Sequence, residues 1–305
     1  MLSKKKIVIF AYGFMGKYTY ESFLKDKNIQ IEGLILPKEG SIYYTSIEIK
    51  KIEKNIKILK SDNKKNIFDF IKKINPDLVI ISTFNKILDK KILSLSKFVN
   101  IHHGKLPKQK GRASINWAII MGRNNIYLTI HEVITKLDAG KIIKQKKFII
   151  NNKDNYFTIK NKINIYLKTS LPLILKKYLD NKVNLKNNVR NKETWNCSRN
   201  PEDGMINFFE KRQNIVRLIK GTNDHNFGAY CFLKEKKITI LEAEIKNGLI
   251  FEGIVPGRII NINKNGSIDC LCFDGPINIK KIMYKDKIMK PSKLIKSTRS
   301  TLLND

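Results

Sequence analysis

Histidine and cysteine are both scarce in this chain, which holds four of each among its 305 residues. Cys270 and Cys272 alternate in "SIDCLCFDG", so we expect them on one face of a β-strand. No second pair of cysteines or histidines lies at a metal-ligand spacing. We therefore interpret the cysteines as reduced structural thiols and expect no metal centre.

Long apolar runs are absent as well, so the sequence predicts no segment that spans a bilayer. The N-terminal "MLSKKKIVIF" begins with lysines, as a signal peptide does. Its apolar run is short, however, and "AYGFMGKY" follows without a small-residue cleavage site. We expect this segment to be the first buried strand of a cytoplasmic protein.

Acidic residues are few, because 27 Asp and Glu stand against 59 Lys and Arg and leave a formal charge of +32. Such a charge favours contact with RNA, anionic lipid or phosphorylated substrates. Arginine, which suits bidentate phosphate recognition, is scarce, and lysine is spread over the whole chain. Lysine, isoleucine and asparagine are abundant together, as AT-rich codon usage produces. A functional charge and codon bias both stay open as explanations.

Strands and helices alternate over the first part of the chain. The continuous apolar stretch "DLVIIST" is typical of a parallel strand buried on both faces of a sheet. Before it, "DNKKNIFDFIKKINPD" places Ile67, Phe70 and Ile71 at helical spacing. The alternation predicts an α/β fold over residues 1–185, with a Rossmann-like, doubly wound and mostly parallel sheet.

The pattern changes after residue 185. Residues 186–203 are polar and turn-rich, and we interpret them as a linker. Residues 204–305 hold one helical segment, "EKRQNIVRLIKGT", and then short strands separated by turns such as "NKNG" and "DGP". This part predicts a small β-rich, barrel-like (OB-like) C-terminal domain.

Asn100 and His102 are the first candidates for chemistry. They end a predicted strand two residues apart and therefore share a face, at the sheet edge where α/β proteins bind ligands. An amide donor and an imidazole could together hold a developing oxyanion and take a proton. Asp138, in "TKLDAGKI", could orient the imidazole. A structural histidine and a plain turn are the simpler interpretations of these residues taken singly.

Several short elements occur together and in order: Asn100-Ile-His102, Leu106-Pro107, Gly111-Arg112, Asn116-Trp117-Ala118-Ile119, Thr129-Ile-His131 and Leu137-Asp138-Ala-Gly140. This series resembles the signature of the folate-dependent formyltransferases. The resemblance implies that Asn100, His102 and Asp138 are catalytic and that 10-formyltetrahydrofolate is the formyl donor, with no metal. It places the folate near two segments, which are Phe84, Asn85, Lys86, Ile87 and Leu88, and Leu137, Ala139 and Gly140.

The acceptor is predicted from three further segments. The stretches "VIFAYGFMG" and "SRNPEDGMINF" resemble the formyltransferase domain that modifies UDP-4-amino-4-deoxy-L-arabinose. The methionyl-tRNA formyltransferases share the core but usually carry a longer basic insertion where this chain has "LPKEGSIYYTSIEI". The resemblance thus favours a nucleotide-linked amino sugar. Initiator methionyl-tRNA is the alternative, and a non-catalytic RNA-binding protein on the same fold is a remote one.

Other residues around the motifs keep two interpretations each. Lys108, Lys110 and Arg112 could contact a diphosphate or the folate tail, or could form a solvated basic loop. His131 is expected to be structural, and Trp195 either stacks on a base or packs between domains. Gly104 departs from the family, which often has serine there. The oligomeric state stays open, a homo-oligomer included.

Overall fold

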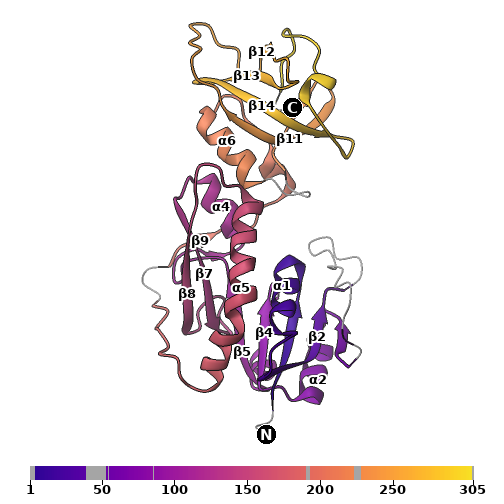
Figure 1. Cartoon of the computed structure of the whole chain (residues 1–305), viewed down its shortest axis with the longest axis vertical. Helices are drawn as coiled ribbons and strands as arrows, with labels where there is room; N and C mark the ends of the chain where they lie inside the picture. Colours follow the sequence, from indigo (N-terminus) through magenta and orange to yellow (C-terminus); the bar gives the residue numbers. More distant parts are fainter. Residues whose placement is uncertain are drawn as a thin grey trace. The chain divides into compact units, whose positions relative to one another are not determined.

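The computed structural model describes residues 4–38, 53, 55–84, 86–189, 193–222 and 228–303. The chain forms two compact units (Figure 1). The first consists of Met1–Gly111, Ile126–Phe148 and Asn161–Asn196, and the second of Arg112–Asn125, Ile149–Lys160 and Cys197–Asp305. The second unit therefore contains short pieces of the N-terminal half in addition to the C-terminal β-rich part.

A seven-stranded sheet forms the centre of the first unit. Its strand order is β3-β2-β1-β4-β5-β7-β8. The strands are β3 (Lys57–Lys60), β2 (Ile29–Leu36), β1 (Lys5–Ala11), β4 (Leu78–Ser82), β5 (Lys97–His102), β7 (Asn125–Glu132) and β8 (Ile142–Ile149). The first five are parallel, whereas β7 runs antiparallel to β5. Every residue of β4 is buried, as its unbroken apolar sequence predicts.

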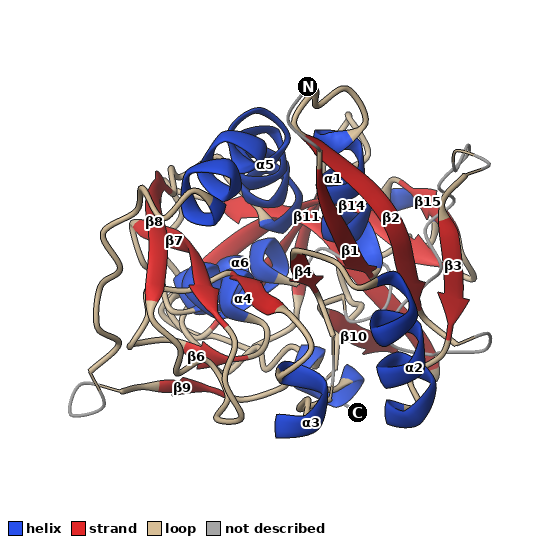
Figure 2. Cartoon of the chain, turned by 90° about the horizontal axis from the view of Figure 1, so that it is seen from below, coloured by secondary structure: helices blue, strands red, loops and turns tan. Residues whose placement is uncertain are grey.

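Helices cover both faces of this sheet (Figure 2). On one side lie α1 (Gly13–Phe23) and the long α5 (Tyr156–Leu179). An ion pair of 3.1 Å between Glu21 and Lys168 joins these two helices. On the other side lie α2 (Lys64–Ile74) and the short α3 (Lys90–Leu93). Asn63 caps the N-terminus of α2, because its side chain accepts hydrogen bonds from the first free backbone N–H groups of the helix.

The second unit has an antiparallel sheet of six strands with the path β10-β11-β14-β13-β12 and with β15 paired to β14. Its strands are β10 (Tyr230–Leu233), β11 (Lys236–Ile245), β12 (Ile259–Ile262), β13 (Ile268–Cys272), β14 (Gly275–Tyr284) and β15 (Lys287–Met289). Near the C-terminus, single β-bridges pair Thr301 with Arg258, just before β12, and Leu303 with Phe232 of β10. The strands β12 and β10 are the two edges of that path. The sheet is therefore curled into the barrel-like form that the sequence predicts.

Two helices complete this unit, namely α4 (Ser114–Ile120) and α6 (Arg212–Gly221). They pack closely, since Asn116 donates to the Gly221 carbonyl at 2.8 Å and a Cβ on Gly221 would collide with Ile120. The predicted fold class, a doubly wound sheet followed by a small β-rich domain, is confirmed. No helix within the described residues is long and apolar enough to cross a membrane.

The four cysteines are free thiols. Cys231, Cys270 and Cys272 are buried in the core of the second unit, and Cys197 is exposed. Burial raises the pKa of Cys231 and of Cys272 to about 12, so these thiols stay protonated and unreactive near neutral pH. Within the described part of the chain, no three of the His, Cys, Asp and Glu side chains form a group that could hold a metal ion.

Candidate active site

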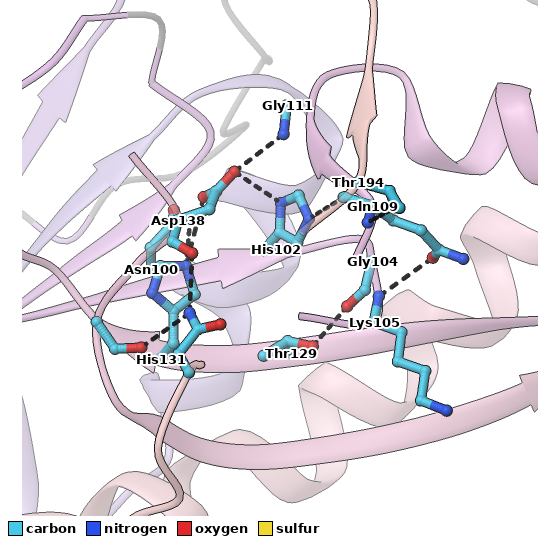
Figure 3. A network of polar contacts seen from close by, with 12 residues as sticks. Asn100, His102, Gly104, Lys105, Gln109, Gly111, Thr129, His131, Asp138 and Thr194 are labelled. Carbon is cyan, nitrogen blue, oxygen red and sulfur yellow. Dashed lines mark hydrogen bonds and ion pairs between the residues drawn. The ribbon is translucent and has the colours of Figure 1, made fainter. Parts of the chain in front are cut away.

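Two neighbouring strands bring the predicted catalytic residues together. Asn100 and His102 lie on β5, and the antiparallel register pairs Asn100 with His131 of β7. The turn that follows β7 carries Asp138 back to the same place (Figure 3). His102, His131 and Asp138 are only 7%, 2% and 6% exposed, so their charges and hydrogen bonds act at low dielectric.

The two ring nitrogens of His102 have different surroundings. Nε2 lies 2.7 Å from the carbonyl oxygen of Gln109, which can only accept, so Nε2 carries a hydrogen. Nδ1 lies 3.7 Å from Oδ2 of Asp138. Burial lowers the pKa of His102 below its ordinary value, and the Asp138 carboxylate opposes this only in part. Near neutral pH the ring is therefore uncharged, with a bare Nδ1 that can take a proton close to the Asp138 carboxylate.

Asp138 is an ionised carboxylate in contact with both rings. Burial alone would raise its pKa, but His131, His102 and the Gly111 N–H group lower the pKa to about 2. The Gly111 N–H donates to Oδ2 at 3.1 Å, and Oδ1 lies 3.5 Å from Nε2 of His131. One oxygen of Asp138 thus points toward each imidazole (Figure 3). Asp138 can stabilise an imidazolium without taking the proton itself.

The His131 ring also contacts Asn100. Its Nδ1 lies 2.7 Å from the carbonyl oxygen of Glu132, and its Nε2 lies 3.1 Å from the Asn100 amide nitrogen. The sequence identified His131 only as a structural residue. Its position beside Asn100 depends on the antiparallel register of β5 and β7, which no short motif encodes.

The loop from Gly104 to Gly111 holds His102 in place. Besides its carbonyl bond to the ring, Gln109 donates its backbone N–H to Thr194 at 2.9 Å and accepts from the Lys105 N–H through its side chain at 3.1 Å. Gln109 has φ +60°, a conformation that costs energy for a residue other than glycine. A Cβ on Gly104 would collide with Nε2 of His102 and with the Gln109 carbonyl. The observed ring position therefore needs glycine at residue 104.

Lys110 is not available as a substrate contact, which corrects the sequence-based interpretation. Its side chain is fully buried, and its ammonium lies 2.6 Å from the Glu193 carboxylate and 5.5 Å from the centre of the Trp195 ring. The cause is the pairing of β6 (Lys110–Gly111) with β9 (Trp195–Asn196), which covers the lysine. Lys108 and Arg112 are exposed, and Arg112 belongs to the second compact unit.

A pocket in the first unit adjoins the catalytic side chains. Its lining is Ile81, Phe84, Lys86, Ile87, Leu88, Asn100, His131, Val133, Ile134, Lys136, Leu137 and Asp138. The structure thus gathers Phe84, Lys86, Ile87, Leu88 and Leu137, five of the residues that the sequence associates with the folate. Asn85 lies outside the described residues. Ala139 and Gly140 do not line the pocket, and Gly140 packs against the Glu132 carbonyl where a Cβ would not fit.

Comparison with known proteins agrees with this arrangement. A family model described as formyl transferase matches residues 38–175, and one described as formyl transferase, C-terminal domain, matches residues 199–299. The methionyl-tRNA formyltransferase of Wigglesworthia glossinidia brevipalpis is 31% identical over 277 residues, which are 87% of this chain and 86% of that protein. The bifunctional polymyxin resistance protein ArnA of the same organism is 30% identical over 271 residues, 85% of this chain. This chain spans 40% of the length of ArnA.

Among solved structures, WlaRD, a sugar 3N-formyl transferase crystallised in the presence of dTDP and 5-N-formyl-THF, has a similar fold. Its TM-score is 0.68 at 18% identity, and the match covers 93% of this chain and 98% of that one. The fold and the polar side chains at its sheet edge are those of an α/β protein with a candidate acid–base site. With a relative 31% identical along most of its length, the chain belongs to the formyltransferase family, as its motifs predict.

Proposed function

We propose that this protein transfers a formyl group from 10-formyltetrahydrofolate to the primary amine of a nucleotide-linked amino sugar. The observation that carries the proposal is the contact of one pocket, lined by the predicted folate segments, with Asn100 and Asp138. The folate would supply the activated formyl group. The protein supplies orientation, a hydrogen-bond donor for the oxyanion and a proton acceptor.

The pocket suits a ligand with an aromatic head and an anionic tail. Apolar side chains make up most of its lining, with Phe84, Leu88 and Val133 among them, and Lys86 and Lys136 add positive charge. Lys86 already pairs with Asp62 at 2.9 Å, so its ammonium is partly neutralised. Lys136 is exposed and is the better candidate for the carboxylates of the folate tail.

In the proposed reaction the uncharged amine attacks the formyl carbon. A C–N bond to the acceptor forms, and the bond between the formyl carbon and the folate nitrogen breaks. Asn100 donates an amide hydrogen to the formyl oxygen as negative charge develops there. Nδ1 of His102 takes the proton from the amine, and Asp138 stabilises the resulting imidazolium. The same proton then passes to the departing folate nitrogen, so the proton count balances.

The nucleotide part of the acceptor has a candidate platform at Trp195. This ring is 53% exposed and lies on β9, next to Thr194, which bonds Gln109. Two hydrogen bonds connect this segment with His102, one from the Gln109 N–H to Thr194 and one from the His102 ring to the Gln109 carbonyl. A base stacked there would suit a nucleotide-linked amine, since aromatic stacking contributes roughly 1–3 kcal/mol per base. Such an acceptor would place the enzyme in the cytoplasmic synthesis of cell-surface polysaccharide.

The second candidate acceptor is initiator methionyl-tRNA. The 31% identity to a methionyl-tRNA formyltransferase and the +32 charge favour it. The "FAYGFMG" and "RNPEDG" elements and the short segment at residues 36–49 favour the sugar. One experiment tests both: the protein is incubated with 10-formyltetrahydrofolate and a panel of amines, and the product is identified by its mass. If no amine gains a formyl group, the proposed function is wrong.

A further inference from the structure

His131 lies between two groups of the proposed machinery and can bond only one of them at a time. Its Nδ1 is used by the Glu132 carbonyl at 2.7 Å, and because that oxygen accepts, Nδ1 carries a hydrogen. Only Nε2 is left. It lies 3.1 Å from the Asn100 amide nitrogen and 3.5 Å from Oδ1 of Asp138.

The protonation state of the ring decides which neighbour Nε2 bonds. In the neutral ring Nε2 has a lone pair, which accepts a hydrogen from the Asn100 amide. In the charged ring Nε2 has a hydrogen, which is donated to Asp138, and the Asn100 N–H group loses its acceptor. Asn100 therefore keeps the observed orientation only while His131 is uncharged.

The orientation of this amide matters for formyl transfer. Asn100 presents either its NH2 group or its carbonyl oxygen to a substrate, and the two ends have nearly the same shape. With one amide hydrogen held by Nε2 of His131, the second is left for a developing oxyanion. With the amide reversed, its carbonyl oxygen would face the same oxyanion and repel it.

We propose that His131 is a positioning residue for formyl transfer, and that its uncharged ring fixes the Asn100 amide with its N–H toward the formyl oxygen. This inference rests on the proposed function. It assigns the two imidazoles opposite requirements: His102 becomes charged during the reaction, whereas His131 must stay neutral.

The charges around His131 fit this division. The His102 ring, on β5, has its centre 6.4 Å from that of His131. The other charged groups are Asp138 and Lys136 in the turn after β7, Lys86 after β4, and Glu132 on β7 itself. The Glu132 carboxylate accepts a hydrogen bond from the Tyr178 hydroxyl at 2.8 Å, so it pairs with that group and not with the imidazoles. Asp138 is then the one carboxylate among these groups that touches the rings. Two imidazolium rings would have to share this carboxylate, and a charge on His131 lowers the pKa of His102, the ring that must take up a proton.

Two substitutions separate the hydrogen bond from simple packing. His131→Gln places a neutral oxygen acceptor near the position of Nε2 and cannot be protonated. His131→Leu fills much of the space but accepts nothing. We expect His131→Leu to lower kcat by about tenfold to a hundredfold, a part of the loss caused by removing an oxyanion donor. KM for both substrates should change by no more than about twofold, and His131→Gln should recover most of kcat.

The double variant with Asn100→Ala gives the sharpest readout. If His131 acts through Asn100, His131→Leu has no further effect once the amide is gone. A loss that multiplies with that of Asn100→Ala would mean a structural role and would overturn the inference. The matched control is His103→Leu, the same change at the neighbouring half-buried histidine, which we expect to leave kcat within about twofold. Thermal unfolding of each variant shows whether it folds.

The outcomes for the inference and for the proposed function can be told apart. A His131→Leu variant with the kcat of the wild type would overturn the inference while formyl transfer by the wild type stands. If the wild type formylates no amine, the proposed function itself fails.

Discussion

Gln109 and His102 form a hydrogen bond of 2.7 Å in which a backbone carbonyl accepts from ring Nε2. The bond has a chemical consequence, since it leaves Nδ1 as the only atom of the ring that can take a proton. That atom faces the Asp138 carboxylate at 3.7 Å. The direction of proton transfer in the proposed reaction is therefore set by a main-chain group, which no side-chain motif records.

The three residues at the sheet edge should act as one unit. Asn100→Ala, His102→Ala and Asp138→Ala are each expected to lower turnover about a hundredfold or more while the protein stays folded. This is roughly the effect of losing a positioned base or oxyanion donor. The triple variant should be little worse than the worst single one, because such groups act together. Steady-state kinetics with circular dichroism checks this. Near wild-type rates in any two single variants would contradict the assignment.

Gly104 should set the basicity of His102. Alanine at residue 104 would place a Cβ against Nε2 and the Gln109 carbonyl and break their hydrogen bond. That bond raises the pKa of His102, so its loss lowers the pKa further. The imidazole is active when neutral, and hence the acid limb of the pH profile should move to lower pH. The weaker base should also lower the plateau of kcat about tenfold.

The control for this prediction is Gly253→Ala, at a glycine where an added Cβ meets no atom. Like Gly104, Gly253 has no positive φ, so the control adds the same methyl group without new backbone strain. Unchanged kcat and an unchanged pH profile in Gly104→Ala would show that the Gln109 bond does not tune His102.

The two residues of the Lys110–Glu193 ion pair should differ in how much free energy of unfolding is lost when each is replaced. Lys110 is fully buried, and the side chain of Glu193 is 16% exposed. Glu193→Gln leaves an ammonium buried without its partner charge, which typically costs about 3–5 kcal/mol. Lys110→Met removes the buried charge and leaves a carboxylate that water can reach, so it should cost less. The double variant should be more stable than Glu193→Gln alone.

Urea unfolding followed by fluorescence measures these differences. Equal losses of stability in the two single variants, with no recovery in the double variant, would argue that the pair contributes little. Kinetics on the same variants would also show whether β6 and β9 support the loop that holds His102.

Formyl transfer should not need a metal ion. The proposed steps use an amide, an imidazole and a carboxylate, and we expect kcat to stay within about twofold after prolonged treatment with a strong chelator. A loss of activity that zinc restores would contradict the proposed mechanism, because zinc would then act as the electrophile.

The sequence predicts the parts of the site that depend on local spacing. Asn100 and His102 stand two residues apart at a strand end, so their common face follows from the period of a β-strand. The burial of β4 likewise follows from its unbroken apolar sequence.

Other features of the site depend on pairings between distant segments. His131 reaches Asn100 through the antiparallel register of β5 and β7, and Lys110 is buried through a strand some 85 residues further along. The bond from His102 to Gln109 involves a carbonyl, which every residue has. Alternation of apolar and polar residues carries no information about these contacts, so the sequence-based interpretations of His131 and Lys110 missed them.

The choice between acceptors should appear in the salt dependence and in Trp195. A tRNA presents many phosphates, and a protein that contacts 6–10 of them loses about 10³–10⁵ in affinity between 50 and 200 mM salt. A nucleotide sugar has only two phosphates, so its KM should rise roughly tenfold or less over that range. We expect the sugar to be formylated and methionyl-tRNA poorly or not at all. Efficient formylation of the tRNA with a steep salt dependence would reverse this choice and leave the reaction type standing.

Trp195 gives the same question a structural test. Trp195→Leu should raise KM for a nucleotide-linked amino sugar about tenfold with kcat unchanged, since stacking on a base contributes roughly 1–3 kcal/mol. Trp195→Phe keeps an aromatic face and should lose much less. The same sugar phosphate without its nucleoside should bind both variants and the wild type alike. Trp117, the other tryptophan, donates its indole N–H to the Cys197 carbonyl at 2.9 Å. Fluorescence quenching by the free nucleotide that is lost in Trp195→Phe would locate the base at Trp195, whereas equal quenching in both proteins would exclude it.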